Sequence, residues 1–64
     1  MNQMPLVHID LVAGRTPEQL KGLVKDVTAA IAKNAVVPEE RVHIVLNEMQ
    51  PDHYSVGGVL KSDQ

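Results

Sequence analysis

Two stretches of the chain alternate apolar and mixed positions in the manner of a β-strand that buries one face. In the first, from Leu6 to Val12, every odd position is apolar, whereas the even positions mix apolar and polar side chains. The second stretch repeats this alternation in the order Arg41, Val42, His43, Ile44, Val45, Leu46 and Asn47. The pattern predicts two strands, the first of them with one firmly buried face.

Between these strands, the sequence predicts an amphipathic helix with a clear start. Thr16 suits the N-cap, Pro17 the first helical position, and Gln19 the reciprocal position of a capping box. Apolar residues then recur at spacings of three and four, which places them on one stripe: Leu20, Leu23, Val24, Val27 and Ile31. We expect the helix to end near Asn34, because β-branched residues and Pro38 follow.

Strand, helix and strand in this order predict a single β-α-β unit of the α/β (α+β) class, with parallel strands. After it, Gly57-Gly58 lies between two valines in the segment from Tyr54 to Leu60, a pattern typical of a tight hairpin. We expect this C-terminal hairpin to form a small arm that pairs with a neighbouring chain. No repeat or linker is visible, so residues 1–64 are expected to form one domain.

The chain is short for an independent fold. It has 64 residues and no cysteine, and a single core in chains below about 70–80 residues rarely contributes more than roughly 3–5 kcal/mol. One helix can cover only one face of the two-stranded sheet. The other face is predicted to carry Leu6, His8, Val12, His43 and Val45. Self-association that covers this face is therefore the expected source of additional stability.

Charge and hydropathy narrow the possible partners. The net charge is −2, and the six Lys and Arg residues are scattered, which argues against nucleic-acid binding. No apolar stretch approaches the roughly 20 residues that cross a bilayer, and no secretion signal is recognisable. We expect no membrane partner. The lack of cysteine fits a reducing cytoplasm.

Pro5 is the most informative candidate for chemistry because it follows a methionine, Met4, that could serve as an initiator. A chain that begins at Pro5 would carry a secondary amine, which is a base, whereas a proline within a chain has only an amide nitrogen. A nearby Arg15 and a water-poor pocket would lower the pKa of that amine toward neutrality. The structural alternative is an ordinary proline at the edge of a first strand.

These elements occur together in a combination that resembles the short-chain 4-oxalocrotonate tautomerase family. The resemblance covers residues 5 to about 60 and rests on these elements in order: Pro5-Leu6-Val7, Gly14-Arg15-Thr16, an amphipathic helix, Pro38, Val42, Glu48-Met49 and Asp52-His53-Tyr54-Ser55-Val56-Gly57-Gly58. It implies a β-α-β protomer in a hexamer, a trimer of dimers, with active sites between subunits. It also implies proton transfer in 2-hydroxydienoate or α-keto acid substrates without a cofactor or metal.

In this scheme Pro5 is the general base and Arg15 binds a carboxylate of the small-molecule substrate. Arg15 stands just before the helix, where the positive end of the helix dipole disfavours a cation unless an anion is present. A solvated loop arginine is the alternative. Tyr54 matches an aromatic position in the wall of the family's pocket, although it could equally pack within the hairpin.

The sequence departs from the family pattern at His43, which stands where well-known members carry a second arginine. Arg41, predicted on the same strand face, could reach a similar region, or His43 could take that role if protonated. His43 could also be a polar residue at a subunit interface. No pair of histidines or acids has the helical spacing of a known zinc motif, so no metal site is expected.

Residues 1–4 precede the expected mature start at Pro5, as a leader or a non-native start, and residues 5–64 would form the core. A form that retains residues 1–4 would have a blocked amine. The competing hypothesis is therefore a non-catalytic oligomeric binding or scaffold protein of the same fold. Hydration, dehalogenation or phenylpyruvate tautomerisation with the same base are further possibilities that the sequence does not separate.

Overall fold

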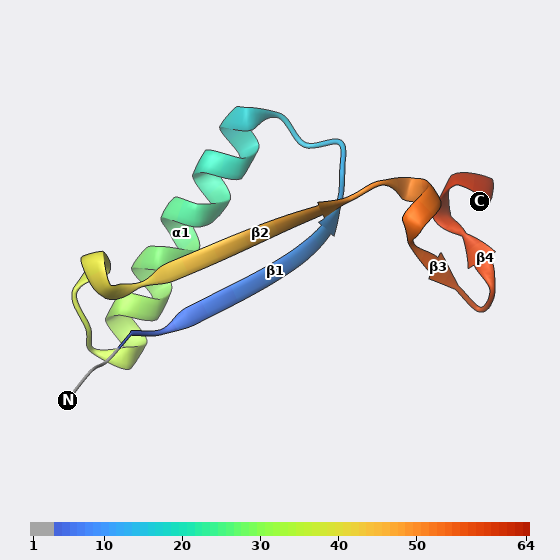
Figure 1. Ribbon diagram of the computed structural model, residues 1–64. Coiled ribbons are helices and arrows are strands. Elements are labelled where there is room, and N and C mark those ends of the chain that lie inside the picture. The colour runs from blue at the N-terminus through green and yellow to red at the C-terminus, as the bar shows by residue number, and fades with distance from the viewer. Residues whose placement is uncertain (1–3) are drawn as a thin grey trace.

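The computed structural model describes residues 4–64, which form a parallel β-α-β unit followed by a small projecting arm (Figure 1). Strand β1 (Leu6–Val12) pairs in parallel with β2 (His43–Met49), and helix α1 (Pro17–Ala35) connects them. The register runs from Leu6 opposite His43 to Val12 opposite Met49. This topology confirms the predicted fold class. Residues 1–3 of the expected leader lie outside the described part of the chain.

The local signals in the sequence account for both ends of α1. The Thr16 hydroxyl accepts a hydrogen bond from the Gln19 amide at 3.1 Å, and the Gln19 side chain accepts one from the Thr16 amide at 2.9 Å. This capping box confirms the predicted start. The helix ends at Ala35, one residue beyond the expected end, and Val36 then adopts a left-handed conformation with φ of 57°. Among residues 4–64, no helix is both long and apolar enough to span a bilayer.

The segment between α1 and β2 differs from the sequence-based expectation. Arg41 was predicted on the second strand, and this prediction is wrong because Glu39–Arg41 form a short 3-10 helix, η1. The Arg41 amide donates to the Pro38 carbonyl and the Val42 amide to the Glu39 carbonyl, both at 3.0 Å. These turns keep Arg41 out of the ladder, so β2 begins at His43.

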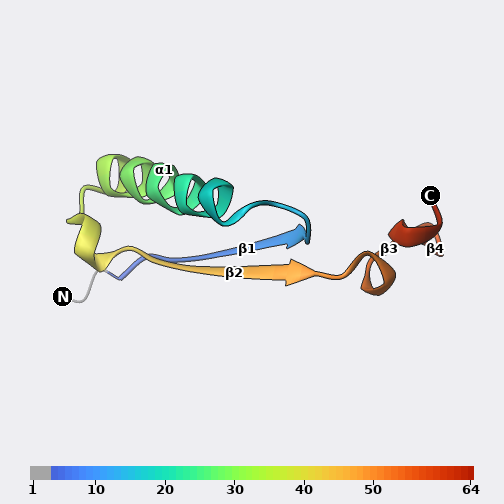
Figure 2. The same ribbon diagram turned by 90° about the horizontal axis from the view of Figure 1, so that it is seen from above.

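Helix α1 covers one face of the sheet and leaves the other open (Figure 2). Residues on the helix side, such as Val7, Ile9 and Leu46, are half-buried, whereas Leu6 is 63% and Val45 44% exposed. Of the predicted open-face residues, only Val12 is half-buried. No apolar side chain among the described residues is fully buried. A single copy therefore lacks the enclosed core that normally stabilises a domain.

The overall dimensions agree with an incomplete unit. The radius of gyration is 14.9 Å, whereas a compact domain of this length would have a value of about 11 Å. The chain extends over 45 × 25 × 14 Å, so it is long and only one sheet and one helix thick. Such a shape leaves a large surface for association with other copies.

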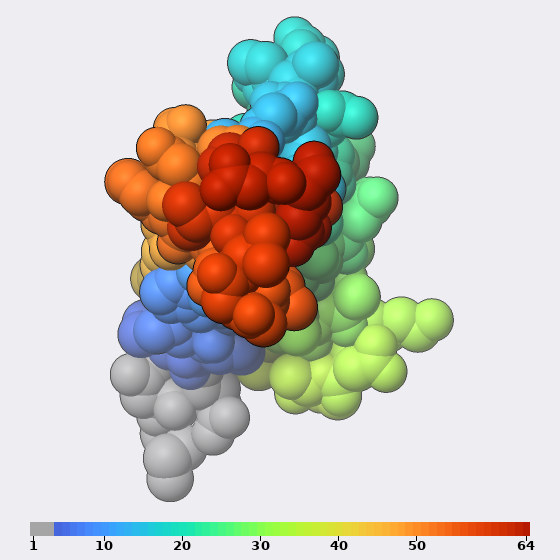
Figure 3. Space-filling model, turned by 90° about the vertical axis from the view of Figure 1, so that its right-hand side faces the viewer, coloured from blue at the N-terminus to red at the C-terminus, as the bar shows by residue number. Residues whose placement is uncertain are grey.

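The C-terminal arm accounts for much of this length. It contains η2 (Pro51–His53), strands β3 (Ser55–Val56) and β4 (Val59–Leu60), and η3 (Lys61–Asp63). Gly57 and Gly58 have φ of 62° and 86°, as a tight hairpin turn requires. Figure 3 views the molecule from the end that carries the arm, whose red and orange atoms stand in front of the body. The predicted hairpin is confirmed, and its pairing with a neighbouring chain stays a prediction.

Candidate active site

Pro5 lies at the amino end of β1, immediately before the first strand residue. Its carbonyl accepts a hydrogen bond from the His43 amide at 2.9 Å, which extends the parallel ladder by one step. Pro5 is half-buried. Its nitrogen forms the amide bond to Met4 in this chain, so the amine exists only in a form that begins at Pro5.

His43 and Arg41 belong to the same end of the sheet as Pro5. His43 is the first residue of β2 and stands opposite Leu6 in the register. Arg41 closes η1 two residues earlier, and both side chains are exposed. The Pro5 end of the sheet therefore carries the His43 imidazole, from strand β2, and the permanent positive charge of Arg41, from the 3-10 helix η1.

Arg15 belongs to the opposite end of the sheet, in the loop between β1 and α1. Its Nη1 donates a hydrogen bond to the Val12 carbonyl at 2.7 Å, which folds the exposed guanidinium back over the end of β1. A strand rises about 3.3 Å per residue, so the seven residues of β1 separate Pro5 from Arg15 by roughly 20 Å. Within one chain these two residues do not form a common site.

Tyr54 also lies away from Pro5, where η2 meets β3 beyond the carboxyl end of β2. Its carbonyl accepts a hydrogen bond from the Lys61 amide at 2.7 Å, and the residue is 38% exposed. The side chain therefore belongs to the arm. This arm projects from the β-α-β body (Figure 1).

The five candidate residues thus fall into two groups. Pro5, Arg41 and His43 lie at the amino ends of the strands, and Arg15 and Tyr54 lie at the carboxyl ends. The described residues of one chain enclose no pocket. A site that contains both groups requires the amino end of one sheet to approach the carboxyl end of another.

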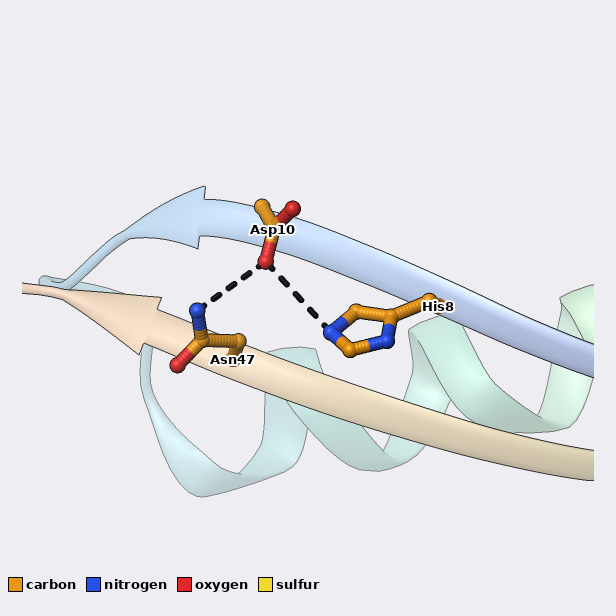
Figure 4. A network of polar contacts seen from close by, with 3 residues as sticks. All are labelled: His8, Asp10 and Asn47. Carbon is orange, nitrogen blue, oxygen red and sulfur yellow. Dashed lines mark hydrogen bonds and ion pairs between the residues drawn. The ribbon is translucent and has the colours of Figure 1, made fainter.

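A polar cluster on the open face of the sheet was not singled out from the sequence. Asn47 Nδ2 donates to Asp10 Oδ1 at 3.0 Å, and His8 Nε2 lies 3.6 Å from the same oxygen (Figure 4). The alternation of His8 and Asp10 along β1 was visible, but their partner on β2 depends on the register. Among residues 4–64, no three His, Cys, Asp or Glu side chains converge on a position for a metal ion.

The fold and the distribution of these residues define a class of small α/β chain with one open sheet face and a projecting hairpin arm. A family model described as "Tautomerase enzyme" matches residues 5–64. The chain therefore belongs to the tautomerase family, which confirms the resemblance inferred from the sequence.

Individual relatives agree with this assignment. A protein of Lactiplantibacillus plantarum named "Probable tautomerase" is 66% identical over 61 residues, which cover 95% of each chain. A heterohexamer 4-oxalocrotonate tautomerase from Chloroflexus aurantiacus is 33% identical, with a TM-score of 0.89 over 94% of this chain and 97% of that one. A further 4-oxalocrotonate tautomerase homologue is 34% identical, with a TM-score of 0.90 over 95% and 97% of the two chains.

Proposed function

We propose that this protein is a cofactor-independent keto-enol tautomerase that acts on 2-hydroxydienoate or α-keto acid substrates, with the amine of Pro5 as general base. The observation that carries the proposal is the position of Pro5. It is the first residue matched by the tautomerase family model, and the match continues to residue 64. A start at this residue creates a secondary amine at the beginning of a strand, and residues 5–64 would then be the functional core.

The reaction needs only one group that accepts and returns a proton. The neutral amine takes the proton of the 2-hydroxyl group, and the electron pair moves through the conjugated carbons to form the C2 ketone. The protonated amine then delivers a proton to a carbon further along the chain. Atoms and electrons balance within the substrate and the amine, as in any isomerisation.

Arg15 is suited to hold the substrate carboxylate. Its guanidinium has five N–H donors in a planar fork, and among residues 4–64 it makes one hydrogen bond, to the Val12 carbonyl. It also lies just before the N-terminus of α1, where a bound anion would offset the unfavourable position of a cation. Arg41 or His43 would contact the second oxygen-bearing group, and Tyr54 would form an apolar wall.

We further propose that the active unit is a homo-oligomer, a hexamer built as a trimer of dimers. The roughly 20 Å between Pro5 and Arg15 in one chain supports the proposal that a second copy supplies the arginine. The open sheet face and the arm offer the surfaces for this contact. The heterohexameric state of the Chloroflexus aurantiacus relative supports the number of six subunits.

The decisive experiment compares a protein that begins at Pro5 with one that begins at Met1. We expect the Pro5-start protein to ketonise 2-hydroxymuconate or a related dienol and the longer form to have lost most of that activity. Pro5→Ala and Arg15→Ala, made in the Pro5-start protein, should each lower kcat/KM by roughly 100-fold or more. Sedimentation should show the same assembly for every variant. Equal rates for the two starts would refute the role of the amine.

One observation favours a second candidate function. In a form that retains residues 1–4, Met4 acylates the Pro5 nitrogen, and Pro5 carries no free amine. If the natural protein retains residues 1–4, it would be an oligomeric binding or scaffold protein of the same fold. Mass spectrometry of the N-terminus of the natural protein distinguishes the two candidates.

A further inference from the structure

We propose that self-assembly through the open sheet face takes up protons at His8, so that copies associate more tightly at about pH 6 than at about pH 8. The occupant of the open face is the open face of a second copy. This inference rests on the proposed homo-oligomer and is independent of the chemistry at Pro5. Its basis is the set of charged groups on this face and the contacts that Asp10 makes there.

The open face carries one carboxylate and no permanent cation. Residues paired in the β1–β2 register lie on the same side of the sheet, and Glu48, opposite Leu11, belongs to the helix side. Neither strand contains a lysine or an arginine. The exposed positions on the open side are Leu6, His8, Asp10, His43, Val45 and Asn47. Only imidazoles on this face can therefore balance the charge of Asp10.

His8 is the imidazole that contacts this carboxylate (Figure 4). Its Nε2 lies 3.6 Å from Asp10 Oδ1, and Asn47 Nδ2 donates to the same oxygen at 3.0 Å. Among residues 4–64, Asp10 forms an ion pair with no other side chain. Because Asn47 is neutral, His8 is the partner that can supply a positive charge.

In a single chain this pair is open to water. The side chains of His8 and Asp10 are 60% and 57% exposed. Ion pairs at such exposed positions contribute little, because water screens their attraction. A charge on His8 therefore changes the free energy of a single copy only slightly.

A second copy that covers this face removes the water. Asp10 then requires a partner of opposite charge, because burial of an unpaired carboxylate costs free energy. Asn47 supplies one hydrogen bond, and protonated His8 supplies the charge. The covered face thus favours protonated His8 more strongly than the uncovered face does, and this difference couples assembly to proton uptake.

The direction of the pH dependence follows from the two side chains. Histidines change charge between about pH 5 and 8. Toward pH 6 the pair forms as the face is covered, whereas toward pH 8 Asp10 loses water without gaining an opposite charge. Assembly should therefore weaken as the pH rises through this range. The effect also needs an ionised Asp10, and carboxyl groups take up protons below about pH 4.

Other titratable groups near His8 compete for the same effect. Val45 is directly opposite His8 in the register, and His43 is its diagonal neighbour on β2. Helix α1 lies on the far side of the sheet (Figure 2). A second copy would bring its own His8, Asp10 and His43. Protonated His43 would repel protonated His8, so its contribution must be separated by substitution.

Charge and apolar surface identify the occupant. A second open face offers exposed Leu6 and Val45 for apolar contact, and two such faces balance their carboxylates when one histidine of each is protonated. The exposed side of α1 is the alternative occupant, and it carries Lys21, Lys25 and Lys33. Its permanent cations would balance Asp10 at every pH between 6 and 8 and give no pH dependence.

The test measures the dissociation constant of the assembly by sedimentation of a dilution series at about pH 6 and pH 8, at one ionic strength. We expect the unmodified protein to associate about tenfold more tightly at pH 6. If dilution does not dissociate the assembly, the midpoint of urea denaturation at fixed protein concentration reports the same change. Calorimetric dilution in two buffers of different ionisation enthalpy at pH 7 should show proton release on dissociation.

Substitutions assign the effect to one pair. His8→Gln and Asp10→Asn should each remove the pH dependence, and either variant is sufficient if the other fails to fold. The matched control is His53→Gln. His53 Nε2 lies 3.7 Å from Asp52 Oδ1 in the arm, away from the open face, so this variant should keep the dependence.

The proposal is overturned if the unmodified protein associates equally or more tightly at pH 8, or if His8→Gln and Asp10→Asn retain the full dependence. It is also overturned if His43→Gln or His53→Gln alone removes the dependence. In these cases the protein still assembles, so the proposed homo-oligomer survives. A monomer at both pH values would reject the homo-oligomer together with this inference.

Discussion

Asn47 donates a hydrogen bond to Asp10 across the open face of the sheet, with 3.0 Å between Nδ2 and Oδ1. The two residues are direct partners in the β1–β2 register, and His8 lies 3.6 Å from the same carboxylate oxygen. The face also carries exposed Leu6 and Val45. When a second copy covers this face, Asp10 and Asn47 lose contact with water. An arrangement of the two copies that leaves these side chains without hydrogen-bond partners costs free energy, so the pair favours one arrangement over others.

Asn47→Asp should therefore weaken self-association. The substitution replaces a hydrogen bond by two carboxylates directly opposite each other, which is unfavourable across neighbouring strands. We expect the dissociation constant of the assembly to rise by about tenfold or more, as measured by sedimentation near pH 8. The control is the exchanged pair Asp10→Asn with Asn47→Asp, which restores one donor and one acceptor and should recover most of the affinity. Unchanged assembly in Asn47→Asp would contradict a role for this face.

The capping box of α1 gives a prediction that does not depend on chemistry at Pro5. Thr16→Ala removes the hydroxyl that accepts from the Gln19 amide at 3.1 Å. It should lower the free energy of unfolding by about 1 kcal/mol, measured by urea denaturation at fixed protein concentration. Thr16→Ser keeps the acceptor and should lose much less. If Thr16→Ala and Thr16→Ser were equally stable, the cap would contribute nothing.

Val36 offers a site where a smaller side chain should increase stability. Its φ of 57° is unfavourable for a β-branched residue. The side chain is 85% exposed, so its packing contributes little to stability. Val36→Gly should raise the free energy of unfolding by about 1 kcal/mol. Val37→Gly is the matched control. Val37 is half-buried and has no positive φ, so this substitution should lower stability. A loss of stability in Val36→Gly would contradict the assigned strain.

Local signals explain why much of the fold could be predicted. Thr16, Pro17 and Gln19 act within one turn, so the start of α1 depends on neighbouring residues alone. Alternation along β1 depends likewise on the strand repeat. The pattern failed at Arg41 because the turn bonds of η1 compete with strand pairing, and the apolar alternation contains no signal for that competition.

The relative positions of the candidate site residues could not be predicted from the sequence. Pro5 and Arg15 could be named from residue types and the family resemblance, and Tyr54 from the resemblance alone, but their positions at opposite ends of the sheet follow from strand direction. The pair formed by Asp10 and Asn47 depends on the register between strands 37 residues apart in sequence. The proposed approach of Arg15 from another copy to Pro5 would be a property of the assembly, and local patterns in one chain do not predict it.

Two glycines in different conformations provide the last prediction. Gly22 lies within α1, and a Cβ atom there would meet nothing within 4 Å. Gly22→Ala should therefore stabilise the helix by about 1 kcal/mol. Gly58 has φ of 86° in the hairpin turn, where an alanine is strained by about 1–2 kcal/mol although space is also available. Space around the new methyl group is equal at the two sites, so the backbone conformation alone decides the sign.

Urea denaturation and sedimentation on both variants separate the two effects. Gly22→Ala should unfold at higher urea concentration with the same assembly state, because the substitution lies on an exposed part of the helix. If the arm pairs with a neighbouring chain as proposed, Gly58→Ala should weaken assembly as well as stability, because it would displace the exposed side chains of Tyr54 and Val56. If Gly58→Ala assembled normally and kept full tautomerase activity, the arm would have no part in contacts between copies. The wall of the site would then have to come from elsewhere in the chain.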